Sequence, residues 1–191
     1  MPVSRPNPIP PNELDLVIDF VNTFDPDTGV DELRTPQSLA AWLRDRNLLD
    51  SATSVRAAQL DQAIRLREAL RTVMLSHNGL EPDPNAASEL DVVVKHGQLS
   101  VRFAADGSSQ LAPRGTGLGA ALARLLVPVA MADADGSWQR VKACRADECQ
   151  WAFYDHSRNR AGVWCDMAVC GNRTKVRAYR RRQPSRSDDT A

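Results

Sequence analysis

The four cysteines constrain the fold of this 191-residue chain more than any other feature, and all lie in its last quarter. Cys144 and Cys149 form one pair, Cys165 and Cys170 a second, with four residues inside each pair and 15 between the pairs. This spacing lets four thiolates converge on one tetrahedral ion at about 2.3 Å. In a reducing compartment such cysteines are more often metal ligands than disulfides. The pattern therefore predicts one Zn²⁺, and its role is structural because four thiolates leave no position for a reactive water.

The segments around the cysteines predict a small ribbon followed by a helix. Residues 141–142 and 151–154 are short apolar and aromatic stretches typical of two strands, and a helix is expected over about 166–182. Such a treble-clef-like module lets turn and helix N–H groups favour the thiolates. His156 is the other candidate ligand nearby. We favour an exposed or hydrogen-bonded loop histidine there, since four thiolates already complete the tetrahedron.

Charge divides the chain although its formal net charge is zero. Residues 1–137 hold 12 Lys/Arg and 18 Asp/Glu, whereas residues 138–191 hold 12 and 6. An acidic body is therefore followed by a basic segment. We expect a proline-rich, disordered leader at 1–12, a body domain at 13–137, the zinc module at 138–184 and a disordered tail at 185–191.

The predicted fold class is α+β, with a mostly helical first domain and a small β-hairpin. Helical spacing of apolar residues indicates helices over 14–21, from Pro36 to about Asn47, over 51–77, near 86–94 and from the 115–119 glycines to about Met131. Over 51–77 the cations Arg67 and Arg71 fall mostly off the apolar stripe. Apolar and polar residues alternate at 99–103, and Asp106-Gly107 offers a turn before 110–113, which predicts the hairpin.

Residues 151–173 resemble the CGNR zinc finger of bacterial proteins. The resemblance rests on FYDHSRNR, on the Trp164-Cys165 pair and on Cys-Gly-Asn-Arg at 170–173. The first part is similar to the ABATE domain that usually precedes this finger, through DFVNT at 19–23, LAAWLRDRNLL at 39–49 and LREAL at 66–70. The resemblance implies Cys144, Cys149, Cys165 and Cys170 as zinc ligands and a stress-related, DNA-binding transcriptional regulator.

The basic segment supplies the candidate nucleic-acid contacts, because clustered arginines favour bidentate bonds to phosphates. The candidates are Arg158, Arg160, Arg173, Lys175, Arg177, Arg180, Arg181 and Arg182. Duplex DNA is the expected partner. The alternative is a zinc-stabilised scaffold that binds protein or RNA, with the basic helix docked on an acidic surface. Two residues also have alternatives to a nucleic-acid role. Arg173 could stack on Trp151 or Trp164 instead of contacting a phosphate, and Asn172 could cap the turn around the thiolates.

Asp19, Asn22 and Thr23 are polar residues within an otherwise apolar segment, so they are candidates for contacts to a small-molecule effector. The alternative is that they bond local backbone at a helix end. The three histidines form no catalytic arrangement, so we expect no enzyme. No apolar run approaches the length of a bilayer span, which predicts a cytoplasmic protein. The oligomeric state stays open, although a dimer would serve DNA recognition.

Overall fold

The computed structural model describes residues 13–182 of the chain. The predicted leader, 1–12, and the predicted tail, 185–191, lie outside the described residues. Within this range the fold is α+β, as predicted, with helices in the majority and the strands arranged as antiparallel pairs. The four cysteines lie together toward the C-terminal end, consistent with the predicted zinc module.

Helices carry most of the described chain. Their bounds are α1 Leu14–Val21, α2 Pro36–Asp45, α3 Ala57–Ser76, α4 Pro84–Gly97, α5 Gly117–Ala134 and α6 Asn172–Arg182. Helix α2 begins as its sequence predicts, because the Ser38 N–H donates to Thr35 Oγ1 at 3.1 Å and Pro36 occupies the first turn. Helix α3 begins later than the predicted residue 51. Asp50 accepts bonds from the N–H groups of Ala52 and Thr53, which turns the chain before the helix.

The strands form three short hairpins. They are β1 Phe24–Asp25 with β2 Val30–Asp31, β3 Leu99–Phe103 with β4 Ser109–Pro113, and β5 Val141–Ala143 with β6 Ala152–Tyr154. The second and third of these hairpins confirm the prediction. The β1–β2 pair was not predicted, because each strand has only two residues and lies in a turn-rich stretch without alternation.

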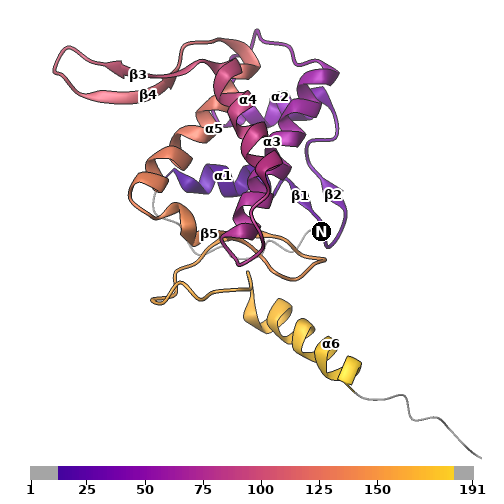
Figure 1. Ribbon diagram of the computed structural model, residues 1–191. Helices are drawn as coiled ribbons and strands as arrows, with labels where there is room; N and C mark the ends of the chain where they lie inside the picture. Colours follow the sequence, from indigo (N-terminus) through magenta and orange to yellow (C-terminus); the bar gives the residue numbers. More distant parts are fainter. Residues whose placement is uncertain (1–12, 183–191) are drawn as a thin grey trace, which may run out of the picture.

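The core of the body extends into the predicted zinc module, whose β5 lies beside α3 (Figure 1). Helix α1 is central, and its Val17, Ile18 and Phe20 are fully buried. The same apolar cluster includes Trp138 and, from the β5–β6 hairpin, Val141, Ala143, Ala152 and Tyr154. Helix α6 projects from this body, and the β3–β4 hairpin extends from another side.

By length and composition alone, α5 could cross a membrane, since its 18 residues have a mean hydropathy of 1.4. This does not overturn the expectation drawn from apolar runs, because α5 is not an uninterrupted apolar run. Arg124 and Asp133 interrupt the apolar residues, so an uninterrupted run does not reveal the helix. Half of the α5 window is buried inside the molecule. A core helix passes the same test, so α5 alone is weak evidence for a membrane span.

Candidate metal centre and basic helix

The four cysteine sulfur atoms meet at the end of the β5–β6 hairpin, all within 4.8 Å of one another. Cys149 Sγ lies 3.6 Å from Cys165 Sγ, which lies 3.7 Å from Cys170 Sγ. Four thiolates around one tetrahedral zinc ion would lie about 3.8 Å apart. The observed spacing fits one such ion and is far longer than the roughly 2 Å of a disulfide.

The thiols are shielded from solvent, since Cys144, Cys149 and Cys170 are buried and Cys165 is half-buried. Hydrogen bonds with neighbouring thiols and burial raise the pKa of Cys165 well above its usual range. Burial and the nearby thiols raise the pKa of Cys170 to about 12. A bound dication reverses this balance because it stabilises thiolates directly. The donor set is therefore suited to a metal that prefers sulfur.

Each cysteine pair is held by a local turn. In the first, the Cys149 N–H donates to Ala146 O at 2.8 Å. In the second, Asp166 Oδ1 accepts the Ala168 N–H at 2.7 Å, and the chain then makes a π-helical turn over Met167–Gly171 that contains Cys170. This turn precedes α6, so the segment predicted as one helix from residue 166 has two parts.

The Cys-Gly-Asn-Arg sequence at 170–173 assigns a different task to each residue. Cys170 faces the sulfur cluster. A Cβ atom on Gly171 would lie 2.3 Å from Met167 Sδ and 3.1 Å from Trp164 Cδ1, so a larger residue would displace the Met167 side chain. Asn172 Nδ2 donates to the Ala168 carbonyl at 3.0 Å, which satisfies the π-helical turn. Arg173 Nη1 donates to Asp27 Oδ1 at 2.8 Å, in the turn between β1 and β2. The motif thus joins the metal centre to the body.

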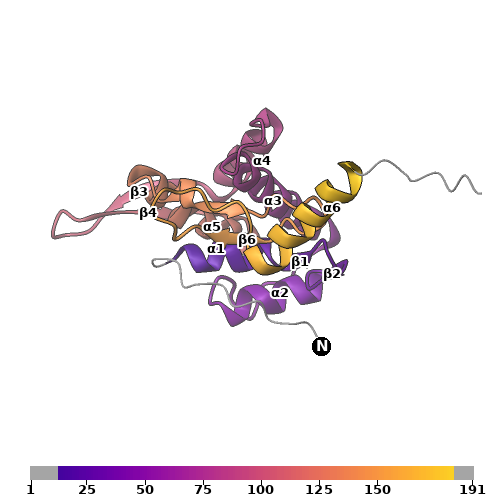
Figure 2. The same ribbon diagram turned by 90° about the horizontal axis from the view of Figure 1, so that it is seen from below.

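Two cations of α6 are already paired with acids. Arg173 lies 3.9 Å from Glu148 in addition to its bond with Asp27, and Arg177 forms an ion pair with the same Glu148. The bond to Asp27 raises the pKa of Arg173, and the bond to Glu148 raises that of Arg177. These contacts anchor the first half of the helix, whose remainder points away from the body (Figures 1 and 2).

The outer part of α6 is exposed and basic. Lys175, Arg180 and Arg181 are exposed, and none forms an ion pair with an acid in the part of the chain that the structure describes. Arg182 ends the helix. Arg158 and Arg160 are exposed in the loop after β6. The structure thus separates the candidate cations into paired residues near the metal centre and exposed residues farther out.

The loop that follows β6 is organised by a buried ion pair. Lys142 Nζ donates to Asp155 Oδ2 at 2.7 Å, with side-chain exposures of 6% and 3%. Burial alone would raise the pKa of Asp155, but hydrogen bonds from Lys142, Ser157 and the Gly162 N–H lower it to about 2. Asp155 and Ser157 of FYDHSRNR therefore have structural roles. His156 is exposed, with its ring 4.8 Å from that of Tyr154, and it is not one of the clustered metal-ligand residues.

Two polar residues that directly follow α1, Asn22 and Thr23, bond to backbone, and Thr23 also accepts from a buried arginine. Asn22 pairs with the Ala152 backbone through two bonds, from Nδ2 to O at 3.0 Å and from the Ala152 N–H to Oδ1 at 2.8 Å. Buried Thr23 Oγ1 donates to Phe20 O and lies 3.3 Å from Arg67 Nη1, which donates to it. The bond of Thr23 to Phe20 is of the local kind that the alternative expects, whereas Asn22 bonds backbone 130 positions away in the chain.

Arg71 joins three elements, although the sequence pattern placed it off the apolar stripe of α3. It is 2% exposed, and its guanidinium donates to the carbonyls of Val21, Phe24 and Gln150. Glu68 accepts from its Nε at 3.0 Å. Sequence reasoning missed this role because helical periodicity assigns a face but not the backbone carbonyls that approach it. The available signal is the spacing of Glu68, within LREAL, and Arg71, directly after it, which suits an i,i+3 ion pair on a helix.

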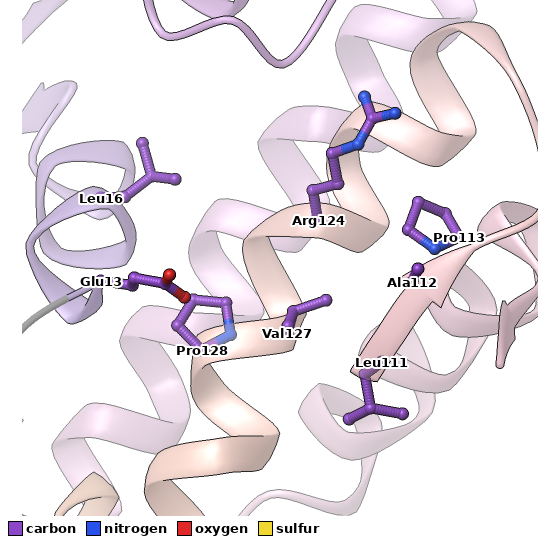
Figure 3. A pocket seen from close by; sticks show the side chains of 8 residues that line it. All are labelled: Glu13, Leu16, Leu111, Ala112, Pro113, Arg124, Val127 and Pro128. Carbon is purple, nitrogen blue, oxygen red and sulfur yellow. The ribbon is translucent and has the colours of Figure 1, made fainter. Parts of the chain in front are cut away.

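The remaining effector candidate, Asp19, is not among the residues that line the groove in Figure 3. Its carboxylate is 57% exposed and lies 3.9 Å from Arg46 Nη2. The groove, of about 370 Å³, lies between α1, β4 and α5. It is lined by Glu13, Leu16, Leu111, Ala112, Pro113, Arg124, Val127 and Pro128. Asp19, Asn22 and Thr23 do not line it, and an effector role for them stays a prediction.

Geometry and sequence comparison together define a class, a protein with a helical body and a C-terminal four-cysteine zinc finger. Residues 140–183 match the CGNR zinc finger. Residues 14–136 match ABATE, described as "putative stress-induced transcription regulator", and the chain belongs to this family. The family prediction made from the sequence is thus confirmed. Among curated proteins, none matches the chain significantly.

Proposed function

We propose that this protein is a zinc-stabilised, DNA-binding transcription regulator whose α6 makes the principal nucleic-acid contacts. The observation that carries the proposal is that α6 projects from the body with Lys175, Arg180 and Arg181 exposed (Figure 1). No acidic residue occurs within Asn172–Arg182. A rigid, anchored helix with clustered arginines is the electrostatic footprint of phosphate binding.

In this proposal, Cys144, Cys149, Cys165 and Cys170 bind one Zn²⁺ that fixes the start of α6. The spacing of the four sulfur atoms supports the assignment. Bound zinc supplies a fixed tetrahedral junction and no reactive water. Metal analysis of protein purified without chelator should give one zinc per chain. Two mapped disulfides and no metal would contradict the assignment.

The two groups of cations have different tasks. Arg173 and Arg177 orient the helix through Asp27 and Glu148, so their charges are largely compensated. Arg180 and Arg181 contact phosphates, with Arg182, Arg158 and Arg160 as further phosphate contacts. A helix that enters a groove reads bases from its N-terminal turns, which makes Lys175 the first candidate for base contact and Arg177 the second.

The salt dependence of duplex binding tests this assignment by titration of labelled DNA. Each phosphate contact contributes a slope of about −0.9 to log K against log salt, so contacts from Arg180 and Arg181 alone predict about −2, and the further arginines steepen the slope toward about −4.5. Arg181→Ala should flatten the slope by about one and weaken all sequences alike. Arg65→Ala, which removes an exposed cation from α3, is the matched control and should change neither value. No binding tighter than about 10⁻⁴ M at low salt would contradict the proposal.

A scaffold that binds protein or RNA is the second candidate. It is favoured by the docked pairs Arg173–Asp27 and Arg177–Glu148 and by exposed apolar residues on α6, Val176 at 48% and Tyr179 at 64%. An RNA panel in the same titration separates the two candidates. We place the regulator in the cytoplasm, where reducing conditions keep thiols available to a metal.

A further inference from the structure

The β3–β4 hairpin extends from the body on a side away from α6 (Figure 1), and it exposes apolar side chains. Phe103 is 75% exposed and Val101 is 51% exposed. Leu111 and Pro113, directly across from Val101 and Leu99, lie on the same face and line the groove of Figure 3. A two-stranded hairpin is marginally stable by itself in water, and further strands or a covering surface stabilise it.

The two outer edges of this hairpin are not equivalent. Ala104 N–H donates to Ser108 O and Arg114 N–H donates to Gln98 O, so the even-numbered residues of β3 bond to β4. By the alternation of an antiparallel ladder, the N–H and C=O groups of Leu99, Val101 and Phe103 point outward. The outer edge of β4 instead carries Pro113, which has no N–H to donate.

We propose that β3 pairs edge to edge with β3 of a second copy of this chain, antiparallel and centred on Val101. This register places Val101 opposite Val101 and Leu99 opposite Phe103, so apolar side chains meet across the two-fold axis. Arg102 then lies opposite Ser100 and not opposite a second arginine. Like charges are thereby kept apart, and the strand is complementary to itself.

The same geometry limits assembly to two copies. Pairing uses the complete β3 edge of both chains, and the edges that remain belong to the two β4 strands, each interrupted by Pro113. The pairing also brings Phe103 of each copy beside Leu99 and the groove side of the other copy's sheet. The result is a closed, four-stranded sheet with one continuous apolar face, which buries surface that is exposed in one chain. This inference does not depend on nucleic-acid binding.

Two matched proline substitutions in the zinc-loaded full chain test the proposal. Val101→Pro removes an outward N–H from β3, and Ser109→Pro removes an outward N–H from β4, while both leave the bonds between the two strands in place. In analytical ultracentrifugation at up to roughly 100 µM, the native chain and Ser109→Pro should sediment as dimers. Val101→Pro should sediment as a monomer with unchanged helical circular dichroism.

A second variant guards against local misfolding. Val101→Lys keeps every backbone donor and brings two ammonium groups together at the axis, so it should weaken the dimer at least tenfold, an effect that added salt reduces. A native chain that stays monomeric over the whole concentration range would overturn the proposal and leave this face for another partner. Dimers of all variants with equal stability would also overturn it, because they would place the interface elsewhere.

Discussion

The β5–β6 hairpin and α6 both belong to the zinc-finger part, but the body holds them by different means. The hairpin contributes buried residues to the main core. Carbonyl groups of the hairpin and of its connecting loop accept hydrogen bonds from four side chains of the body, those of Asn22, Arg71, His77 and Asn78. Helix α6 meets the body through the ion pair of Arg173 with Asp27, whose side chains are 34% and 20% exposed. The cysteine cluster is the main link between these two segments.

This difference indicates how the stability of the finger is divided. A small module buries too little apolar surface to fold alone, and metal free energy usually makes up the deficit. Here packing against the body provides part of the missing stabilisation for the hairpin. Helix α6 has no comparable packing, since Val176, Tyr179 and its outer cations are exposed. Its position should depend on the metal.

The largest effect on stability is expected from removal of the buried Arg71 guanidinium, which bonds α3 to three backbone carbonyls of other segments. Arg71→Met leaves three carbonyls, those of Val21, Phe24 and Gln150, without their donor, and it also removes one of the two arginine partners of Glu68. We expect a loss of about 3–5 kcal/mol in the free energy of unfolding, measured with urea. Arg65→Met on the same helix, where the side chain is 53% exposed, should cost about 0.5 kcal/mol or less. Equal losses of stability for Arg71→Met and Arg65→Met would contradict this role of Arg71.

An intermediate, pH-dependent effect is expected at Asp155. Its pKa is lowered from 3.8 to about 2 in the folded protein, so its stabilising contribution is complete above about pH 4 and is lost as pH falls toward 2. Asp155→Asn should cost about 2 kcal/mol at pH 7, and the difference from the native chain should shrink between pH 4 and 2. The exposed Asp147→Asn serves as control. A difference that does not change with pH would exclude the charge as the cause.

The smallest effect is expected at the contact of α6 with the body. Asp27→Asn weakens a partly exposed ion pair, so the free energy of unfolding should change by no more than about 1 kcal/mol, with zinc content unchanged. Binding to DNA should become slightly tighter at low salt because Arg173 is released from its acid. A destabilisation as large as that of Arg71→Met would mean that α6 is part of the core, contrary to the comparison above.

The periodic elements could be predicted from the sequence because their signals are local. Helix α1 has the predicted bounds, and Thr35-Pro36 starts α2 as expected. Asp106-Gly107 marks the β3–β4 turn, where Ser108 N–H and Oγ bond to the Asp106 side chain. The start of α3 and the β1–β2 pair were missed, since both depend on short-range side-chain bonds that periodicity does not contain.

The metal cluster follows from spacing, but the contacts around it do not. Nothing in the local pattern shows that Arg71 reaches Gln150 across 79 positions or that Asn22 pairs with Ala152 across 130. Periodicity gave Arg71 an outward face, and tertiary packing buried it. Likewise the charge of α6 is visible in the sequence, whereas the division into paired Arg173 and Arg177 and exposed Lys175 requires the position of Asp27 and Glu148.

Hydrogen exchange with and without a chelator tests the central claim most directly, namely that metal holds α6 while the body holds the hairpin. After zinc removal, amides of the cysteine turns, such as Cys149 and Cys170, and of the first turns of α6 should lose at least about 100-fold in protection. Amides within β5, β6 and α3 should keep theirs, so protection would extend past the boundary predicted between residues 137 and 138. Loss of protection in the hairpin together with α6, or none in either, would contradict the account.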